Sequence, residues 1–351
     1  MDKKVHLELL RIIAIFLVMF NHTWIRGFSY FNSCVGTPWY WVYLFFSILV
    51  KIDVPLFFMI SGALLLGKEE SIGTLYRKRV LRAAIALVLF SFVSYLYLIY
   101  LGDVSEFRLK EFLIALYTGS ISGHYWFMYR YIGFLMLLPI LRVAVKHFTD
   151  IHYAYIVGLF LLVQAVKITE YAVSHGTVFY DGSFDLFILQ DLIIFPIVGY
   201  YIENKMPDER ANSKTFYIMC IASFISVIIS CIMTWYSCTI IGEWYESTCQ
   251  TFFNNLILIP TATAYLGALL LFRNHQFNEK ILSIIVFVGS TSFGVYLLEQ
   301  IYRNETIDIY YDLLPYIGSY ASSLIWITCA FMIGVAVTAV LKLIPGLKKI
   351  I

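Results

Sequence analysis

Long apolar runs separated by short polar connections make up almost the whole chain. A transmembrane helix requires about 20 consecutive apolar residues, and about ten stretches reach or approach that length. We therefore predict an all-α polytopic integral membrane protein with about ten transmembrane helices. The predicted spans are residues 7–25, 40–66, 80–101, 124–142, 153–168, 186–204, 215–236, 250–272, 281–301 and 321–344.

Two stretches depart from a simple spanning run. The second run, residues 40–66, is long and is interrupted by Lys51, Asp53 and Pro55. The stretch EFLIALYT at residues 111–118 is too short to cross a bilayer. It predicts a short helix that lies in the membrane interface.

The composition indicates a membrane protein without a separate soluble domain. The chain has 351 residues, of which 60% are hydrophobic and 14% are charged, whereas about a quarter of the residues in a soluble domain are charged. Because no large polar stretch occurs, we expect one membrane domain over residues 1–351 that contains any chemistry. The first run can span and no small-residue cleavage site follows it, so we do not expect a cleavable signal. The net charge of +2 gives no sign of a nucleic-acid partner.

The distribution of lysines and arginines predicts the orientation in the bilayer. With the N-terminus inside, the cytoplasmic segments hold most of these residues, and the outer loops hold Arg26, Arg108, Lys110 and Arg303. Cytoplasmic segments of membrane proteins carry an excess of positive charge. We therefore expect a multi-pass protein of the cell membrane with both termini in the cytoplasm.

The predicted outer loops carry acids and aromatic residues instead. They include residues 39–41 (WYW), residues 243–246 (EWYE) and residues 308–312 (DIYYD). Such faces can stack against sugars or small polar ligands, but an ordinary membrane-interface belt has the same composition. Of these two interpretations, the interface belt is the one we favour.

The six cysteines do not form a C-x-x-C pair, which makes a metal site or a redox motif an unfavoured interpretation. Cys238 and Cys249 flank one short loop. They could pair if that loop lies outside the cell, and they could equally be free, small apolar residues.

The first apolar run contains two ionisable residues, Arg11 and His22. Their separation is almost three helical turns, so Arg11, Ile15, Val18 and His22 lie along one stripe, with roughly 16 Å between its ends. Ionisable groups inside a membrane usually face a protein interior or a watery cavity. Arg11 is expected near the cytoplasmic end and His22 near the outer end. Alternatively, Arg11 pairs with Glu8 and snorkels, and His22 is an interface histidine with a hydrogen bond to a neighbouring helix.

Five short motifs occur in order along the chain. They are R-x10-H in the first run, preceded by LELL, then PLFFMISGALL at 55–65, YRKRVLR at 76–82, HYWFMY at 124–129 and TSFGVYLLEQ at 291–300. Together they resemble the acyltransferase-3 family of integral-membrane acyltransferases, and the likeness covers essentially the whole chain. Two departures stand out: Glu299 occupies a position where many relatives have histidine, and the basic motif lacks the proline that often follows it.

The resemblance implies transfer of an acyl group, commonly acetyl, from cytoplasmic acyl-CoA. The acceptor would be a hydroxyl of a cell-surface glycan or of another small molecule. Acetyl-CoA would then be the donor substrate, the lipid bilayer would surround the enzyme, and no metal is implied. The alternatives are a transporter of a small polar solute such as an amino acid, and a glycan flippase or scaffold without chemistry.

For the acyl-transfer step, the resemblance assigns the central role to His22. An imidazole gains and loses a proton near neutral pH, which suits a general base that takes the proton of the acceptor hydroxyl. Glu299 is expected near the outer end of its span, where it would orient the imidazole or bind the acceptor. Asn21 could assist at this site, but an ordinary polar residue on the helix face is the favoured interpretation.

For the donor, the basic motif provides Lys78, Arg79 and Arg82 as ligands of the nucleotide phosphates, since guanidinium groups bind phosphates in bidentate fashion. Anchoring of the helix by positive residues on the cytoplasmic side is an equally good interpretation. Arg11 would contact the phosphates or the polar arm of CoA from within the membrane. Trp126 would line the donor tunnel or belong to the interface belt.

The remaining polar and small residues of the motifs receive structural roles. Ser61 and Gly62 permit a close helix approach and are interpreted as packing residues. His124 is expected to be an interface residue rather than a second base.

Overall fold

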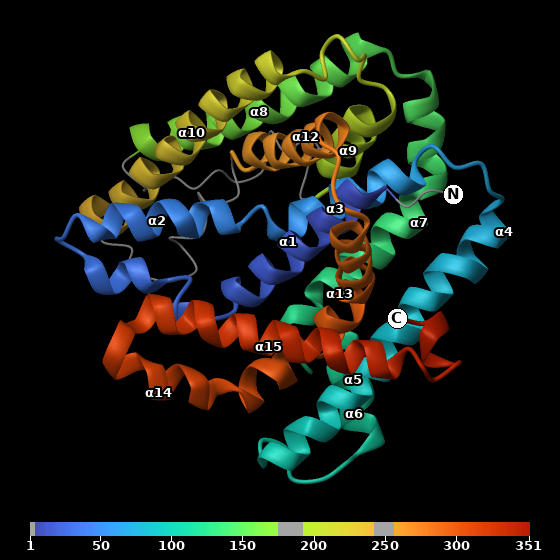
Figure 1. Cartoon of the computed structure of the whole chain (residues 1–351), viewed down its shortest axis with the longest axis vertical. Helices are drawn as coiled ribbons and strands as arrows, with labels where there is room; N and C mark the ends of the chain where they lie inside the picture. The colour runs from blue at the N-terminus through green and yellow to red at the C-terminus, as the bar shows by residue number, and fades with distance from the viewer. Residues whose placement is uncertain (1–3, 175–191, 242–255) are drawn as a thin grey trace. The chain divides into compact units, whose positions relative to one another are not determined.

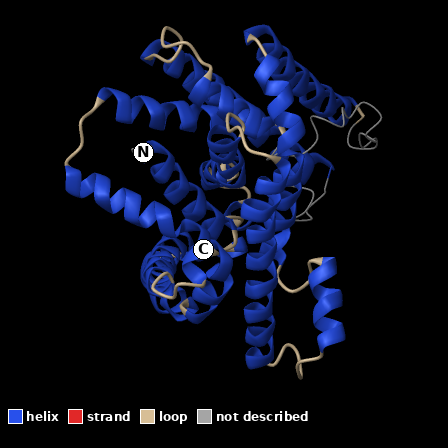
Figure 2. Cartoon of the chain, turned by 90° about the vertical axis from the view of Figure 1, so that its right-hand side faces the viewer, coloured by secondary structure: helices blue, strands red, loops and turns tan. Residues whose placement is uncertain are grey.

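The computed structural model describes residues 4–174, 192–241 and 256–351 of the chain. In these residues the protein consists of helices and connecting loops, without a strand (Figure 2). The predicted all-α class is therefore confirmed for the described part of the chain.

Most of the helices coincide with predicted apolar runs, whereas α14 includes residues 308–312, which were expected in an outer loop (Figure 1). They are α1 (Val5–Asn21), α2 (Trp39–Val50), α3 (Asp53–Leu65), α4 (Ile72–Leu75), α5 (Leu81–Leu101), α6 (Leu109–Thr118), α7 (Trp126–His147), α8 (Asp150–Val173), α9 (Ile194–Asn204), α10 (Ser213–Trp235), α12 (Leu258–Asn274), α13 (Glu279–Glu305), α14 (Ile307–Ile317) and α15 (Ser319–Leu341).

The chain divides into two compact units, each built from segments that are distant in the sequence. The first unit comprises Met1–Gly67 and Arg142–Val286, and the second comprises Lys68–Leu141 and Phe287–Ile351. His22 therefore belongs to the first unit and Glu299 to the second.

Seven helical stretches in the described residues are long and apolar enough to cross a membrane. They are Trp39–Leu65, Ile72–Leu101, Gly123–His147, Asp150–Val173, Ser213–Thr239, Glu279–Glu305 and Ser319–Leu341. The predicted spans 7–25, 186–204 and 250–272 correspond to α1, α9 and α12, which have 17, 11 and 17 residues. Residues 186–191 and 250–255 of those spans lie outside the described residues. The structure thus supports seven of the roughly ten predicted spans.

The three shorter helices form the interior of the first unit together with α3, which packs against α1, α9 and α12. The contact between α3 and α9 depends on glycine. A Cβ atom on Gly62 would lie 1.9 Å from the backbone oxygen of Pro196, and one on Gly199 would lie 2.2 Å from the backbone oxygen of Met59. Because each glycine faces the backbone of the other helix, this approach is closer than any side chain permits. The predicted packing role of Gly62 agrees with this geometry.

The second unit contains a helical hairpin and a short helix. α14 and α15 are joined by Gly318, which has a φ of +76°, and the two helices pack against each other (Figure 1). The stretch 111–118 forms α6, a helix of 10 residues, so the prediction that it is too short to span is confirmed. One face of α6 buries Phe112, and Leu113 and Tyr117 are exposed. This two-sided character suits the predicted interfacial position.

The cysteines are partly oxidised. Cys238, just beyond α10, forms a disulfide, and Cys34, Cys220, Cys231 and Cys329 are free. Cys249 lies outside the described residues, as does the aromatic stretch 243–246.

Candidate functional site

The stripe on α1 faces the interior of the protein. Ile15 and Val18, between the two ionisable residues, are 0% and 4% exposed. His22 follows the last residue of α1, and its N–H donates to the carbonyl oxygen of Val18 at 3.2 Å, so the helical register extends to it. Arg11 and His22 therefore share one face, as their spacing predicts, and His22 is half-buried.

Arg11 forms an ion pair within α1. Its Nη1 donates to Oε1 of Glu8 at 2.7 Å, and the side chains of Arg11 and Glu8 are 30% and 9% exposed. The pairing that the sequence offered as an alternative is therefore present. Since Arg11 is partly exposed and has further N–H donors, the pair leaves it able to contact an additional anion.

Near the N-terminus of α1, Glu203 at the end of α9 joins three helices of the first unit. It accepts from Lys4 Nζ at 2.7 Å and from the Tyr265 hydroxyl at 2.8 Å, and it pairs with His6 Nε2 at 2.9 Å. Burial opposes the ionisation of Glu203, but the hydrogen bonds from His6 and Lys4 outweigh it and lower its pKa to about 2. The cluster has no local signal in the sequence, because Lys4 and His6 are 199 and 197 residues from Glu203 and Tyr265 is 62 residues from it.

This cluster predicts a pH-dependent contribution to stability. A carboxyl whose pKa is lowered on folding stabilises the protein above its ordinary pKa of 4.5, and that contribution is lost as the pH falls towards about 2. We expect the free energy of unfolding of the wild type to exceed that of Glu203→Gln by a constant amount above about pH 5. The excess should shrink on further acidification. Thermal unfolding in detergent at a series of pH values measures it, and the exposed Glu279→Gln is the control; an excess that does not change with pH contradicts the prediction.

The other end of α1 meets the interruption in the run Trp39–Leu65. Asn21 Nδ2 donates to Asp53 Oδ2 at 3.2 Å, and Asn21 Oδ1 accepts from Lys51 Nζ at 3.3 Å. Asp53 Oδ1 also accepts the N–H of Val54 at 2.6 Å. His22, the next residue after Asn21, lies within electrostatic range of Asp53. Asn21 therefore links two charged side chains, which is a more specific structural role than the ordinary helix-face residue that the sequence favoured.

The first helix ends earlier than the sequence predicts. The predicted span 7–25 ends at Asn21, because Thr23 turns the chain: its hydroxyl donates to Phe20 O at 2.7 Å and accepts from the N–H of Phe28 at 2.8 Å. Asn21 pairs with residues from the middle of Trp39–Leu65. His22 directly follows the residue that makes these contacts. Hydropathy alone does not show this turn, since the residues after it are also apolar.

The basic motif of the second unit includes a π-helical turn, Tyr76–Val80. Arg79 makes a bidentate ion pair with Glu70, with Nε to Oε1 at 2.8 Å and Nη2 to Oε2 at 3.3 Å. Arg82 Nε donates to the carbonyl oxygen of Ile350 at 3.1 Å, and Lys78 is exposed. The carboxylate of Glu70 thus accepts from the two N–H groups of the Arg79 guanidinium that would otherwise bind a phosphate.

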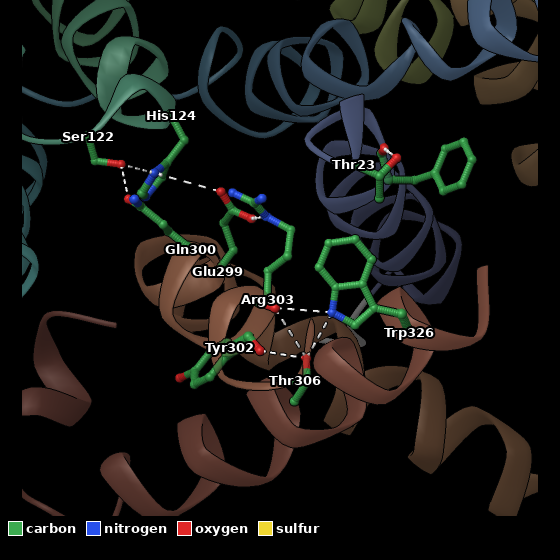
Figure 3. A network of polar contacts seen from close by, with 10 residues as sticks. Thr23, Ser122, His124, Glu299, Gln300, Tyr302, Arg303, Thr306 and Trp326 are labelled. Carbon is green, nitrogen blue, oxygen red and sulfur yellow. Dashed lines mark hydrogen bonds and ion pairs between the residues drawn. The ribbon is translucent and has the colours of Figure 1, made fainter. Parts of the chain in front are cut away.

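Glu299 belongs to a buried polar network (Figure 3). Its Oε1 lies 3.7 Å from Nδ1 of His124, and its Oε2 accepts from Arg303 Nε at 3.4 Å. The side chains of Glu299 and His124 are 1% and 3% exposed. Ser122 Oγ lies 2.5 Å from Nδ1 of His124 and also donates to Gln300 Oε1. Ser122 therefore links His124 to Gln300.

His124 is enclosed by aromatic rings. Its ring centroid lies 4.1 Å from that of Tyr125 and 5.6 Å from that of Tyr296, and the Tyr296 hydroxyl donates to the carbonyl oxygen of His124 at 2.6 Å. The interpretation of His124 as an interface residue was wrong, because the protein buries it. The motif HYWFMY, which begins with His124, was the sequence feature that could have drawn attention to this histidine. Trp126, in the same motif, is 47% exposed at the start of α7.

Within the described ranges, no group of three or more His, Cys, Asp and Glu side chains is arranged to hold a metal ion.

Comparison with known proteins agrees with the sequence motifs. Neither the curated proteins nor the solved structures that were compared contain a match to the chain. The model of the acyltransferase-3 family, described as an acyltransferase domain, matches residues 5–343. The match covers nearly the whole chain, including the stripe on α1, the basic motif and the network around Glu299. The chain therefore belongs to this family of membrane acyltransferases.

Proposed function

We propose that the protein transfers an acyl group, in the first place acetyl, from cytoplasmic acyl-CoA to a hydroxyl of a cell-surface glycan or another small acceptor. The observation that carries the proposal is the position of His22. It ends a stripe whose middle residues are buried, and it adjoins a polar cluster in the interior of an apolar protein. An imidazole in this position is suited to proton transfer in a reaction that water does not enter freely.

In the proposed reaction His22 is the general base. It takes the proton of the acceptor hydroxyl while the oxygen attacks the thioester carbon. The tetrahedral intermediate then collapses, the C–S bond breaks, and the thiolate of CoA takes the proton from the imidazolium. Glu299 is proposed as a second functional group, which binds the acceptor or orients the imidazole. Its complete burial beside His124 supports a functional role, since membrane carboxylates rarely lack one.

The donor nucleotide is proposed to bind at Lys78, Arg79 and Arg82 on the cytoplasmic side, and Arg11 is proposed to contact the CoA arm within the membrane. The bidentate pair of Arg79 with Glu70 supports this assignment, because it presents a guanidinium in the geometry that recognises phosphate. Trp126 is proposed as a wall of the donor tunnel. Donor binding would exchange the Glu70 carboxylate for a phosphate.

This exchange predicts opposite effects of two substitutions. Arg79→Ala should raise the KM for acetyl-CoA about 10-fold with little change in kcat, because a charge-assisted contact to phosphate is lost. Glu70→Ala removes the same ion pair but leaves the guanidinium free, so the KM should stay the same or fall. Steady-state kinetics of both variants measure the difference. If both raise the KM equally, the ion pair itself is what matters and Arg79 does not bind the donor.

The proposed activity is tested with membranes that contain the protein and with the purified protein in detergent. Radiolabelled acetyl-CoA should lose its label to a glycan or small-molecule fraction, and chromatography should show release of free CoA at the same rate. A transporter is the second candidate, because the break between α2 and α3 within one span resembles the interrupted helices that form transporter binding sites. If labelled acetyl-CoA neither binds nor turns over, the acyltransferase proposal fails and transport becomes the better explanation.

For the surroundings, we propose a multi-pass protein of the cell membrane with both termini in the cytoplasm and a single membrane domain over residues 1–351. The basic motif would then face the cytoplasmic donor, and the segment with Cys238 would face outwards. Cleavage of an engineered protease site after Lys349 in sealed, inverted membrane vesicles tests the position of the C-terminus.

A further inference from the structure

Lys51 places a positive charge in the middle of an apolar span. It lies 12 residues after Trp39 and 14 residues before Leu65 in the stretch Trp39–Leu65. A charge at that position is costly in lipid, and such residues face the protein interior or a watery cavity. Lys51 as a whole is half-buried, and it lies in the interior of the first unit beside Asn21.

The contacts of the Lys51 ammonium leave hydrogen-bonding capacity. An ammonium group has three N–H donors. Among the described residues, Lys51 Nζ donates to Asn21 Oδ1 at 3.3 Å and lies 4.7 Å from the centroid of the Phe28 ring. These two contacts account for two of the three donors. The third is available for an oxygen atom that carries negative charge.

The carboxylate of Asp53 offsets the positive charge of Lys51, but its hydrogen bonds come from other groups. Its two oxygens accept from Asn21 Nδ2 and from the N–H of Val54 at 3.2 and 2.6 Å. The hydrogen bonds of Asn21 thus fix both charged side chains at the break between α2 and α3. A lysine retained only to satisfy Asp53 would donate to it directly, whereas here the amide of Asn21 stands between the two groups.

Lys51 and His22 both lie within electrostatic range of Asp53. Asn21, which accepts from Lys51, is the last residue of α1, and His22 is the next residue. An acyl transfer needs both a base and a group that stabilises the negative charge that develops on the thioester oxygen. In the first unit, the cluster at the end of α1 brings a histidine and a cation with a free donor to the same place.

We propose that Lys51 is the oxyanion-stabilising residue of the acyl transfer; this rests on the proposed function with His22 as base. When the acceptor oxygen bonds to the thioester carbon, its proton passes to His22 and the carbonyl π electrons move onto the carbonyl oxygen. Lys51 Nζ–H donates to that oxygen. When the electrons return, the C–S bond breaks and the CoA thiolate takes the proton from His22.

The test compares Lys51→Met with Lys51→Arg. Methionine keeps the length of the side chain without donors, so kcat for acetyl-CoA should fall about 100-fold, with the KM for acetyl-CoA changed by less than about threefold. Arginine keeps charge and donors and should restore much of the rate. Lys342→Met, which removes another half-buried lysine that donates to a carbonyl oxygen, is the matched control and should keep the wild-type kcat.

The outcomes separate this inference from the proposed function. If Lys51→Met turns over at the wild-type rate while His22→Ala is inactive, the role of Lys51 is refuted and the function stands. If His22→Ala also turns over at the wild-type rate, the proposed mechanism itself fails. A rise in KM without a loss in kcat would show ground-state binding and would also overturn the inference. If Lys51→Met does not fold, Lys51→Gln is measured instead, and the same fall in kcat relative to Lys51→Arg is required.

Discussion

His22→Ala is expected to lower the turnover of acyl transfer by about 100- to 10,000-fold, the usual contribution of a general base. The physical reason is that an alcohol attacks a thioester slowly unless its proton is removed as the C–O bond forms. The imidazole sits at the end of a buried stripe, so bulk water is a poor substitute for it. Release of CoA from acetyl-CoA, measured with the purified variant, gives the rate.

The result is specific only if the variant is folded and the donor still binds. His22 is half-buried at the end of α1, so its truncation should leave the thermal unfolding temperature nearly unchanged. The KM for acetyl-CoA should also change little, since the loss concerns the chemical step. His275→Ala, at an exposed loop position, is the matched control and should have wild-type turnover. Full turnover of His22→Ala would falsify the proposed mechanism.

Gly62→Ala is expected to have the largest effect on stability. The added Cβ would lie 1.9 Å from the backbone oxygen of Pro196, and a backbone atom cannot rotate away as a side chain does. α3 and α9 must therefore separate, and the α1 and α12 contacts with α3 loosen with them. Overpacking of this kind costs about 1–3 kcal/mol or more. We expect a clearly lower unfolding temperature in detergent and a lower yield of monodisperse protein.

The control for this substitution is another helical glycine of the same unit. Gly158 in α8 is exposed, and a Cβ built on it meets nothing within 4 Å. Gly158→Ala should leave stability unchanged or raise it slightly, by about 0.5–1 kcal/mol, because alanine favours a helix. Gly199→Ala should resemble Gly62→Ala, since its Cβ would meet the oxygen of Met59 at 2.2 Å. Equal stability of Gly62→Ala and Gly158→Ala would show that the helices are not held at this distance.

Hydropathy predicted where helices form more accurately than how each one is used. The run that contains α9 is as apolar as a spanning segment, yet eight of the 11 residues of α9 are buried within the protein. An apolar side chain gains similar free energy from protein packing and from lipid, so composition does not distinguish a helix that faces lipid from one enclosed by other helices. The same ambiguity applies to α1 and α12, which pack on α3.

The candidate site was predictable only where its residues are close in sequence. The spacing of Arg11 and His22 placed them on one face, because helical periodicity is a local property. The link between Asn21 and Lys51 crosses 30 residues, and the contact of His124 with Glu299 crosses 175. Such contacts depend on tertiary packing, for which a single sequence has no local signal. Lys51 and Asp53 were nevertheless visible as charges inside an apolar run, which is the mark of a functional position in a membrane.

The end of α1 at Asn21 also bears on which acyl donors the enzyme would accept. In the proposed reaction the length of α1 sets how far the arm of CoA reaches, because this arm has the same length in every acyl-CoA and ends at the same level beside His22. The length of α1 therefore cannot distinguish acetyl from a longer acyl chain. In the proposed reaction that choice would depend on the residues that surround the acyl group, and we expect the buried Phe28 and Phe31, which follow the turn and are 1% and 2% exposed, to be among them. Enlarging the space at these two residues would then admit donors with longer chains, with the reach of α1 unchanged.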